Sequence, residues 1–451
     1  MPNSEPPRRS AFDRLRRTLG LHRGLDVDPD LPPGDAARVA KSIDELLAQR
    51  ETNAQRADAQ RLVGVYEGLD ADGRARFLEL LAERFGTDAD AIDRAGAKLR
   101  SAGSPADRVA AERELRRSVA PRYAELLHVV TGLPHGVGFL VELRADLLAH
   151  PERSGTLGLL QDELTGHLST LFDVGLLELR QITWNSPASV LERLMETEAV
   201  HAIRDWDDLR HRLDGDQRCF GFFHPALVNE PIVFVEVALT RGLTANLPHL
   251  LERDDTVDAP DTAIFYSITS AQPGLAGVHL GNELIKQVVD QLRRDEDELK
   301  TFATLSPIPG FRAWLLAQVD GDDLTPAELE AFAGDAHAIA ALDDRRWLED
   351  RTVEERVKPA VLSAAARYLQ STREGRARDP VANFHLSNGA SLERLNWLAN
   401  PAEYGIDESL GVMVNYLYDR GRIASNAGAY LADGTIKASG HVRGLVKTTK
   451  L

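Results

Sequence analysis

Two polar residues in the second half of the chain have the side chains of an acid–base pair. Ser306 follows a short apolar run and precedes Pro–Ile–Pro–Gly, which fixes the backbone directly after the hydroxyl. His385 lies in a second apolar run that ends at Asn388 and Gly389. An imidazole titrates near neutral pH and a hydroxyl both donates and accepts, so the two can move a proton together. Taken singly, each is also typical of a structural residue, the serine in a turn and the histidine at a strand end, and no spacing joins them.

A glycine-containing loop is the second candidate site. It lies between an apolar run at 263–268 and an amphipathic run at 283–292, and it contains Gly274, Gly277 and Gly281. Glycines let a backbone approach an anion closely, and the N-terminus of the following helix offers unpaired N–H groups and the positive end of its dipole. The loop therefore predicts a phosphate or pyrophosphate site, although a plain strand–turn–helix connection explains the spacing equally well. It matches neither G-x-G-x-x-G nor the nucleoside-triphosphatase loop.

Composition excludes several classes of protein. The 451 residues suit two or three domains. Lys and Arg number 53 against 70 Asp and Glu, for a net charge of -17, so there is no basic excess to bind a nucleic acid. Cys219 is the single cysteine, which excludes a disulfide framework and a cysteine-based metal site. No apolar stretch reaches the roughly 18 residues of a membrane span.

The periodicity divides the chain into a tail, a helical domain and a mixed domain. Residues 1–33 are rich in Pro and Arg, which predicts a disordered tail. Residues 34–178 repeat apolar side chains at spacings of three and four, which predicts an α-helical domain for scaffolding or self-association. Residues 179–451 predict a mixed α/β domain with a helical insertion at about 324–370. Its strands are expected at 219–224, 232–239, 263–268, 301–305, 382–386 and 411–418.

Three sequence blocks together resemble the malonyl-CoA decarboxylase family: 265–289, 305–315 and 379–400. Weaker support comes from 230–240 and 411–418. Part of the glycine loop, Gln272-x-Gly274-x-x-Gly277, also resembles the loop that holds coenzyme A pyrophosphate in GCN5-related acetyltransferases, with Gly274 one position early. One departure is Asp379, where the family pattern has Asn; we regard it as harmless.

The resemblance implies a helical bundle followed by a catalytic domain of the GCN5-related acetyltransferase-like (GNAT) fold. It implies conversion of malonyl-CoA to acetyl-CoA and CO2 through a thioester enolate protonated at C2, without metal, biotin or pyridoxal phosphate. Ser306 and His385 occupy the catalytic positions, with His385 as the expected proton donor, and Tyr418 is a further candidate. The expected coenzyme A-binding residues are Gln272, Gly274, Ala276, Gly277, Val278, His279, Leu280, Gly281 and Asn282.

The resemblance also implies a homo-oligomer, a dimer or tetramer, formed through the helical domain. The Ala- and Arg-rich composition is typical of a GC-rich bacterium, so we expect a cytoplasmic protein and interpret the terminal Thr449-Lys450-Leu451 as a coincidental likeness to a peroxisomal signal. Two alternatives stay open. An acyltransferase of the same fold would need an acceptor amine, and a noncatalytic acyl-CoA-binding protein would need the loop but not the Ser306–His385 pair.

Overall fold

The computed structural model describes residues 25–252, 256–278, 281–318 and 345–447. The chain divides into two compact units. The first comprises Met1–Leu177 with two short segments from later in the chain, His224–Val228 and Gln272–Val278. The second comprises the remainder of the chain. The segment 272–278, which holds most of the glycine loop, thus belongs to the first unit although it follows a strand of the second.

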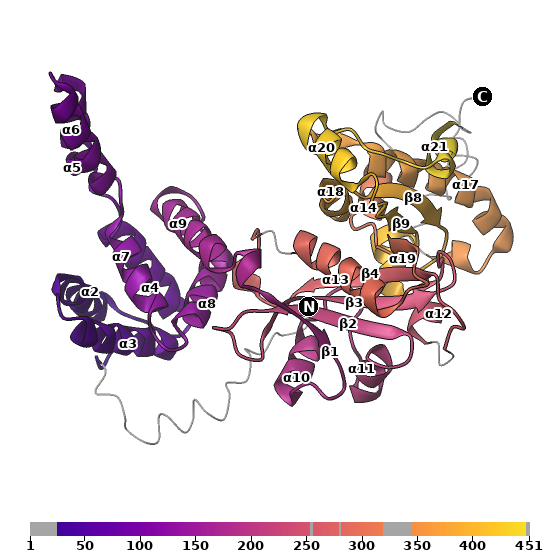
Figure 1. Cartoon of the computed structure of the whole chain (residues 1–451), viewed down its shortest axis with the longest axis horizontal. Helices are drawn as coiled ribbons and strands as arrows, with labels where there is room; N and C mark the ends of the chain where they lie inside the picture. The colour runs from indigo at the N-terminus through magenta and orange to yellow at the C-terminus, as the bar shows by residue number, and fades with distance from the viewer. Residues whose placement is uncertain (1–24, 253–255, 279–280, 319–344, 448–451) are drawn as a thin grey trace. The chain divides into compact units, whose positions relative to one another are not determined.

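The first unit is helical over the part that the structure describes, as the apolar spacing predicts (Figure 1). The repeat of leucines in α9 buries one face of that helix through Leu160, Leu164 and Leu168. Side-chain oxygens cap several helices by accepting from first-turn N–H groups, as Asp70 does from Gly73. The helices are α2 (Pro33–Ala48), α3 (Thr52–Gly68), α4 (Ala71–Arg84), α5 (Ala89–Ser101), α6 (Pro105–Ser118), α7 (Arg122–Thr131), α8 (Gly136–Ala149) and α9 (Gly155–Leu171).

The expected tail of residues 1–33 is too long. Residues 1–24 lie outside the described residues, but residues from 25 onward pack on the first helices. The Leu31 side chain is fully buried, and the carbonyl of Pro29 accepts from the N–H of Asp70. A side chain at Gly73 would collide with that same carbonyl. One buried leucine and one close backbone approach fix this segment, despite its proline-rich composition.

The second unit is built on a seven-stranded sheet with the order β1-β2-β3-β4-β5-β9-β8. Neighbours from β1 to β4 are antiparallel, and β4 and β5 are parallel. The strands are β1 (Glu178–Ile182), β2 (Gln217–Phe223), β3 (Pro231–Thr240), β4 (Thr262–Ser270), β5 (Thr301–Thr304), β8 (Ser391–Asn396) and β9 (Met413–Leu417). A separate two-stranded ribbon joins β6 (Thr372–Arg373) and β7 (Arg376–Ala377).

Helices cover both faces of the sheet (Figure 1). On one side, α10 (Ala188–Thr197) and α11 (Trp206–Arg212) pack a cluster that includes Leu194, Leu209 and Phe234. On the other, α13 (Gly281–Asp295) buries Leu284, Ile285, Val288 and Leu292, as its amphipathic pattern predicts. The short helix α12 (Leu247–Leu251) follows β3. The strands between these helices are almost wholly apolar because both of their faces are covered.

Strands β4 and β5 separate at a defined point. The N–H of Leu305 still donates to the carbonyl of Phe265 of β4, at 3.0 Å. One residue later the partner changes, and Ser306 exchanges two hydrogen bonds of 2.9 Å with Val414 of β9. Opposite β3, the register of β4 shifts so that Tyr266 has no partner, which is a β-bulge. Two parallel strands that diverge are the arrangement expected of an acetyltransferase-like domain.

The predicted strand at 382–386 is wrong. These residues lie in the helix α18 (Pro380–Ser387). The Asp379 side chain caps the helix by accepting from the N–H of Ala382 at 2.7 Å, and Pro380 occupies the first turn. The sequence Asp-Pro is a helix-start signal, and it outweighs the short apolar run that follows.

The remaining helices gather around β8 and β9 (Figure 1). Helix α17 falls within the predicted insertion at about 324–370, whereas residues 319–344 lie outside the described residues. The helices are α14 (Phe311–Ala317), α17 (Arg351–Gln370), α18, α19 (Glu403–Ser409), α20 (Ile423–Asp433) and α21 (Gly440–Lys447).

Candidate active site

Ser306, His385 and Tyr418 form a hydrogen-bonded chain in the second unit. The Ser306 Oγ lies 3.1 Å from the Nε2 of His385, and the His385 Nδ1 lies 2.8 Å from the Tyr418 hydroxyl. All three side chains are buried, with at most 5% of their surface exposed. The structure thus brings together the three catalytic candidates that sequence spacing alone could not connect.

Each member of the chain comes from a different element. Ser306 lies where the backbone leaves β4 and pairs with β9, so the strand separation aims its hydroxyl. His385 is on the last turn of α18, and the Asp379 cap and Pro380 fix the residue at which this helix begins. Tyr418 follows β9, and its N–H donates to the carbonyl of Phe302 of β5 at 2.9 Å. The tertiary fold, and not local sequence, creates the constellation.

Thr304 is a fourth member that the sequence analysis did not identify. Its Oγ1 accepts a hydrogen bond from the Ser306 hydroxyl at 2.8 Å and another from the N–H of Tyr416 at 3.2 Å. The signal in the sequence is its position two residues before Ser306, because side chains i and i+2 of an extended segment face the same side. Thr304 therefore fixes the direction of the Ser306 O–H bond.

The surroundings of His385 keep its imidazole neutral. The ring stacks on that of Tyr416, with centroids 4.4 Å apart, and its burial lowers the pKa of His385 to about 3. A neutral imidazole has one N–H group. Since the Ser306 hydroxyl hydrogen is directed at Thr304, the Nε2–H of His385 faces Ser306, and Nδ1 accepts from the Tyr418 hydroxyl. Burial raises the pKa of Tyr418, which keeps this phenol protonated.

Asp379 lies at the start of the helix that carries His385, and it is fully buried. Its Oδ1 caps α18, whereas its Oδ2 has no hydrogen-bond partner in the described part of the chain. Burial is the largest cause that raises its pKa, to about 7, and two backbone N–H groups at the helix start oppose that rise. The departure from the family pattern thus places a titratable group in the core beside the candidate site.

Residues 272–278 of the glycine loop belong to the first unit and begin with a 3-10 turn, η2 (Pro273–Leu275). Gly274 packs against helix α8, where an added Cβ would lie 1.8 Å from the carbonyl oxygen of Val141. The structure therefore gives this glycine a packing role. Gly277 differs, because its φ is +82° and an added Cβ would meet no atom within 4 Å.

The other predicted loop residues are placed unequally. Gln272 is buried, Ala276 is exposed and Val278 is half-buried. His279 and Leu280 lie outside the described residues, and Gly281 and Asn282 form the first turn of α13.

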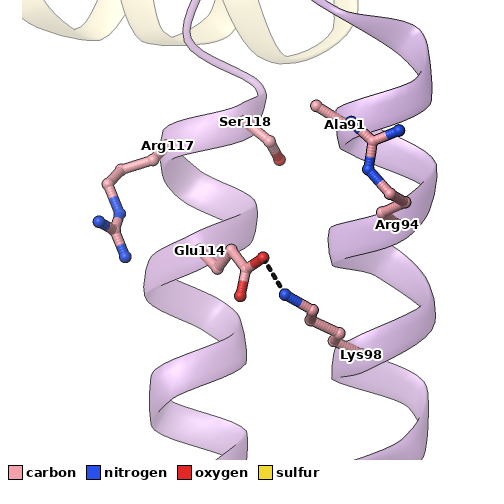
Figure 2. Close-up of a pocket in the computed structure, with 6 residues that line it drawn as sticks. All are labelled: Ala91, Arg94, Lys98, Glu114, Arg117 and Ser118. Carbon is pink, nitrogen blue, oxygen red and sulfur yellow. Dashed lines mark hydrogen bonds and ion pairs between the residues drawn. The ribbon is translucent and has the colours of Figure 1, made fainter.

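A separate hollow lies between α5 and α6 of the helical unit (Figure 2). An ion pair between Lys98 and Glu114 crosses it. None of the residues predicted from the sequence as catalytic or coenzyme A-binding lines it. The lining residues are Ala91, Arg94, Lys98, Glu114, Arg117 and Ser118.

Two other kinds of feature, a metal-binding cluster and a membrane-spanning helix, are absent from the described ranges. No group of three or more His, Cys, Asp or Glu side chains there could hold a metal ion. No helix among these residues is long and apolar enough to cross a membrane.

The divergent strands are those expected of an acetyltransferase-like domain, and the buried hydroxyl–imidazole–phenol chain is a candidate site for acid–base chemistry in it. Comparisons with known proteins identify the family. The family model of the malonyl-CoA decarboxylase C-terminal domain matches residues 175–451, and that of the N-terminal domain matches residues 85–172. The chain therefore belongs to the malonyl-CoA decarboxylase family.

Similar proteins cover nearly the whole chain. The mitochondrial malonyl-CoA decarboxylase of Anser anser anser is 35% identical, over 96% of this chain and 93% of its own, and that of Mus musculus is 34% identical, over 96% of both. The crystal structure of malonyl-CoA decarboxylase from Rhodopseudomonas palustris has a TM-score of 0.83 at 40% identity, and covers 91% of this chain and 99% of its own. The Agrobacterium vitis structure has a TM-score of 0.84 at 38% identity, with the same coverage.

Proposed function

We propose that this chain, a carboxy-lyase by its family, converts malonyl-CoA to acetyl-CoA and CO2, with the Ser306–His385 pair delivering the proton to C2. The observation that carries the assignment of residues is the buried chain from Tyr418 through His385 and Ser306 to Thr304. A fixed sequence of donors and acceptors in a buried site is suited to proton delivery.

The reaction needs little from the protein beyond placement and one proton. The bond between C2 and the carboxylate breaks, CO2 leaves, and the electron pair is delocalised onto the thioester oxygen as an enolate. A proton then adds to C2 and gives the acetyl thioester. Because the thioester carbonyl is itself the electron sink, we propose that no metal, biotin or pyridoxal phosphate takes part. Backbone N–H groups where β4 and β5 separate would stabilise the oxyanion.

His385 supplies the proton in this proposal. Its Nε2–H transfers to C2 while Nδ1 takes the proton of the Tyr418 hydroxyl, so the imidazole ends neutral and the phenolate is reprotonated by solvent. Ser306 orients the imidazole by accepting from its Nε2–H. Thr304 holds the Ser306 hydroxyl in the direction that leaves its lone pair toward the imidazole.

The coenzyme A part of the substrate is assigned to the loop from Gln272 to Asn282. Support comes from Gly277, whose positive φ and open surroundings suit a close approach by a pyrophosphate oxygen. We therefore keep Gly277 as the principal glycine of this site and assign Gly274 to packing against α8.

Incubation with malonyl-CoA in D2O and without an acceptor tests the proposal. We expect release of CO2 and one deuterium in each acetyl methyl group, because the group that protonates C2 has exchanged its proton for deuterium from the solvent. Turnover only with an added amine would indicate an acyltransferase, and binding without turnover a noncatalytic acyl-CoA-binding protein. Either of these results would contradict the proposed reaction.

We also propose that the chain forms a homo-oligomer through its helical domain and acts in the cytoplasm. The α5–α6 hairpin extends from the other helices of its unit (Figure 1) and buries few of its own side chains, notably Ala95 and Ala111. Val109 and Val119 are about half exposed on or beside it. Light scattering on the intact chain and on a variant with both valines changed to Asp tests whether this hairpin takes part in assembly.

A further inference from the structure

Arg144 of helix α8 donates hydrogen bonds to the backbone of the glycine loop. Its Nη1 donates to the carbonyl of Gly274 at 2.5 Å, and its Nη2 donates to the carbonyl of Ala276 at 2.8 Å. Its Nε donates to the Thr165 hydroxyl of α9 at 3.1 Å. The side chain is only 3% exposed, and all of these partners lie in the first unit. One buried guanidinium thus fixes two alternate carbonyls of the loop.

The second of these bonds determines the orientation of a turn. The N–H of Val278 donates to the carbonyl of Leu275 at 3.0 Å, which closes a β-turn with Ala276 and Gly277 at its centre. Ala276 has φ -55° and ψ 131°, and Gly277 has φ +82°. These angles define a type II turn, which needs glycine at its third position. The sequence Ala-Gly therefore suits this turn specifically.

The central peptide of the turn, between Ala276 and Gly277, has its carbonyl on the side of Arg144 and its N–H on the other side. In a planar trans peptide the C=O and the N–H point in opposite directions. Because the Ala276 carbonyl binds the guanidinium, the N–H of Gly277 is directed to the opposite side. That N–H has no acceptor among the residues described, and no atom there would contact a Cβ at Gly277. The turn therefore presents one backbone donor that no described residue accepts from.

The charge of Arg144 favours the binding of an anion near the N–H of Gly277. Its partners are two carbonyls and a hydroxyl, and no carboxylate in the described part of the chain forms an ion pair with it. Burial lowers its pKa, since the cation is removed from water without a neighbouring negative charge. A buried positive charge that lacks a counterion stabilises a negative ligand nearby.

We propose that Arg144 is a positioning residue for coenzyme A: it holds the 275–278 turn with the Gly277 N–H directed outward, toward the pyrophosphate of the substrate. The inference rests on the proposed coenzyme A site and extends it, because it gives the helical domain a part in substrate binding. A flip of the Ala276–Gly277 peptide would turn the N–H inward and the carbonyl toward the anion. The hydrogen bond from Arg144 to the Ala276 carbonyl opposes that flip.

Arg144→Met and Arg144→Lys test this role. Methionine keeps much of the buried volume but donates no hydrogen bond, and lysine keeps the charge but cannot hold two carbonyls with a planar fork. We expect Arg144→Met to raise the KM for malonyl-CoA about tenfold or more, with kcat within about twofold, since charge-assisted hydrogen bonds that act on binding are lost. Arg144→Lys should lie between this variant and the wild type. Isothermal titration with coenzyme A should show the same order of affinities.

Malonyl-pantetheine separates positioning from a merely structural role. This thioester lacks the pyrophosphate, so Arg144→Met should leave its kcat/KM within about twofold of the wild type. An equal loss with both thioesters, or unchanged affinity for coenzyme A in a folded variant, would overturn the inference. The matched control is Arg74→Met, which removes an arginine of the same unit that contacts α8 through Asp146 but binds no loop carbonyl.

The experiment also distinguishes a failure of the proposed decarboxylase activity from a failure of the inference about Arg144. If the wild type bound coenzyme A but released no CO2, weaker binding by Arg144→Met would still support the positioning role. If the wild type used the two thioesters equally well, the loop would not be the pyrophosphate site, and the inference would be wrong together with that assignment.

Discussion

The Nε2 of His385 lies 3.1 Å from the Oγ of Ser306, although 79 residues separate the two in the sequence. Ser306 is held by its pairing with β9, and His385 by the cap and first turn of α18. Two elements with independent reasons to form therefore fix the distance between a hydroxyl and an imidazole. This arrangement makes the pair a preorganised site, whose removal should affect chemistry more than binding.

Ser306→Ala and His385→Ala should each lower kcat strongly and leave the affinity for coenzyme A near that of the wild type. In the proposed mechanism the pair acts where charge and proton move, whereas the loop holds the coenzyme A part of the substrate. General acid catalysis contributes about 10²–10⁴-fold, so losses of that order are expected. Steady-state kinetics and titration calorimetry measure the two quantities.

If the two residues act as one unit, the double variant should be little slower than the poorer single variant. The competing explanation is that both side chains only stabilise the fold. It would be supported if kcat, corrected for the folded fraction, stayed near the wild-type value in His385→Ala.

Tyr418→Phe should lower kcat by about tenfold or more with little change in KM. The substitution removes the hydroxyl that donates to His385 Nδ1, so the imidazole loses the group that fixes its tautomer and replaces its proton. A tenfold loss corresponds to about 1.4 kcal/mol, which is the size of one hydrogen bond. Initial rates across a range of malonyl-CoA concentrations give both constants.

Tyr416→Phe is the matched control for that variant. The Tyr416 ring stacks on His385 at 4.4 Å, but its hydroxyl is buried without a hydrogen-bond partner among the described residues. Its removal should leave kcat within about twofold of the wild type and not reduce stability. Equal losses in the two tyrosine variants would argue against a specific role for the Tyr418 hydroxyl.

The sequence predicts the strands whose residues are apolar on both faces, and it misses those whose pairing depends on a neighbour. Every residue of β3 is buried, and its run of β-branched side chains was a clear signal. By contrast, β1 and β8 have the sequences ELRQI and SLERLN, and they were not predicted. Both lie at the edges of the sheet and form because β2 and β9 supply their hydrogen bonds.

The same limit applies to the candidate site. Family resemblance identified Ser306, His385 and Tyr418, but the role of Thr304 depends on a contact with a side chain two residues away and on a backbone N–H of another strand. The packing of Gly274 against Val141 joins segments far apart in the sequence, so the loop pattern alone could not separate Gly274 from Gly277. Such roles follow from tertiary contacts, which local spacing does not encode.

Gly277→Val should weaken coenzyme A binding much more than it lowers stability. A β-branched residue is strained at a φ of +82° and would place its methyl groups in the space assigned to the pyrophosphate. We expect a loss of affinity of about tenfold or more by titration calorimetry. An unchanged affinity in a folded variant would exclude the turn as the pyrophosphate site.

Gly274→Ala should lower stability much more than it weakens coenzyme A binding. Its Cβ would lie 1.8 Å from the Val141 carbonyl oxygen, so the loop or α8 must shift and the melting temperature should fall. Comparing the two glycine variants thus separates a packing glycine from a ligand-contacting one. A stable Gly274→Ala variant would show that the contact with α8 is not tight.

Asp379→Asn should stabilise the protein at neutral and alkaline pH. The pKa of Asp379 is raised by burial from 3.8 to about 7 in the folded state. Below about pH 4 the group is protonated in both states and contributes no difference. Between about pH 4 and 7 it ionises in the unfolded chain but not in the folded one, so the free energy of unfolding falls as the pH rises. Above about pH 7 the decrease in the free energy of unfolding is complete, and it amounts to about 1.4 kcal/mol for each unit of difference between the folded and unfolded pKa.

Asparagine cannot ionise, yet its Oδ1 can still accept from the N–H of Ala382 and cap α18. The difference in melting temperature between Asp379→Asn and the wild type should therefore be small at pH 4 and grow until about pH 7–8, where it corresponds to roughly 1–4 kcal/mol. The nearby phenols of Tyr368 and Tyr416 do not titrate in this range, because burial raises their pKa values. Thermal unfolding of both proteins in a common buffer series measures the curve. A difference that is constant from pH 4 to 8 would show that Asp379 does not titrate in the folded protein as its burial requires.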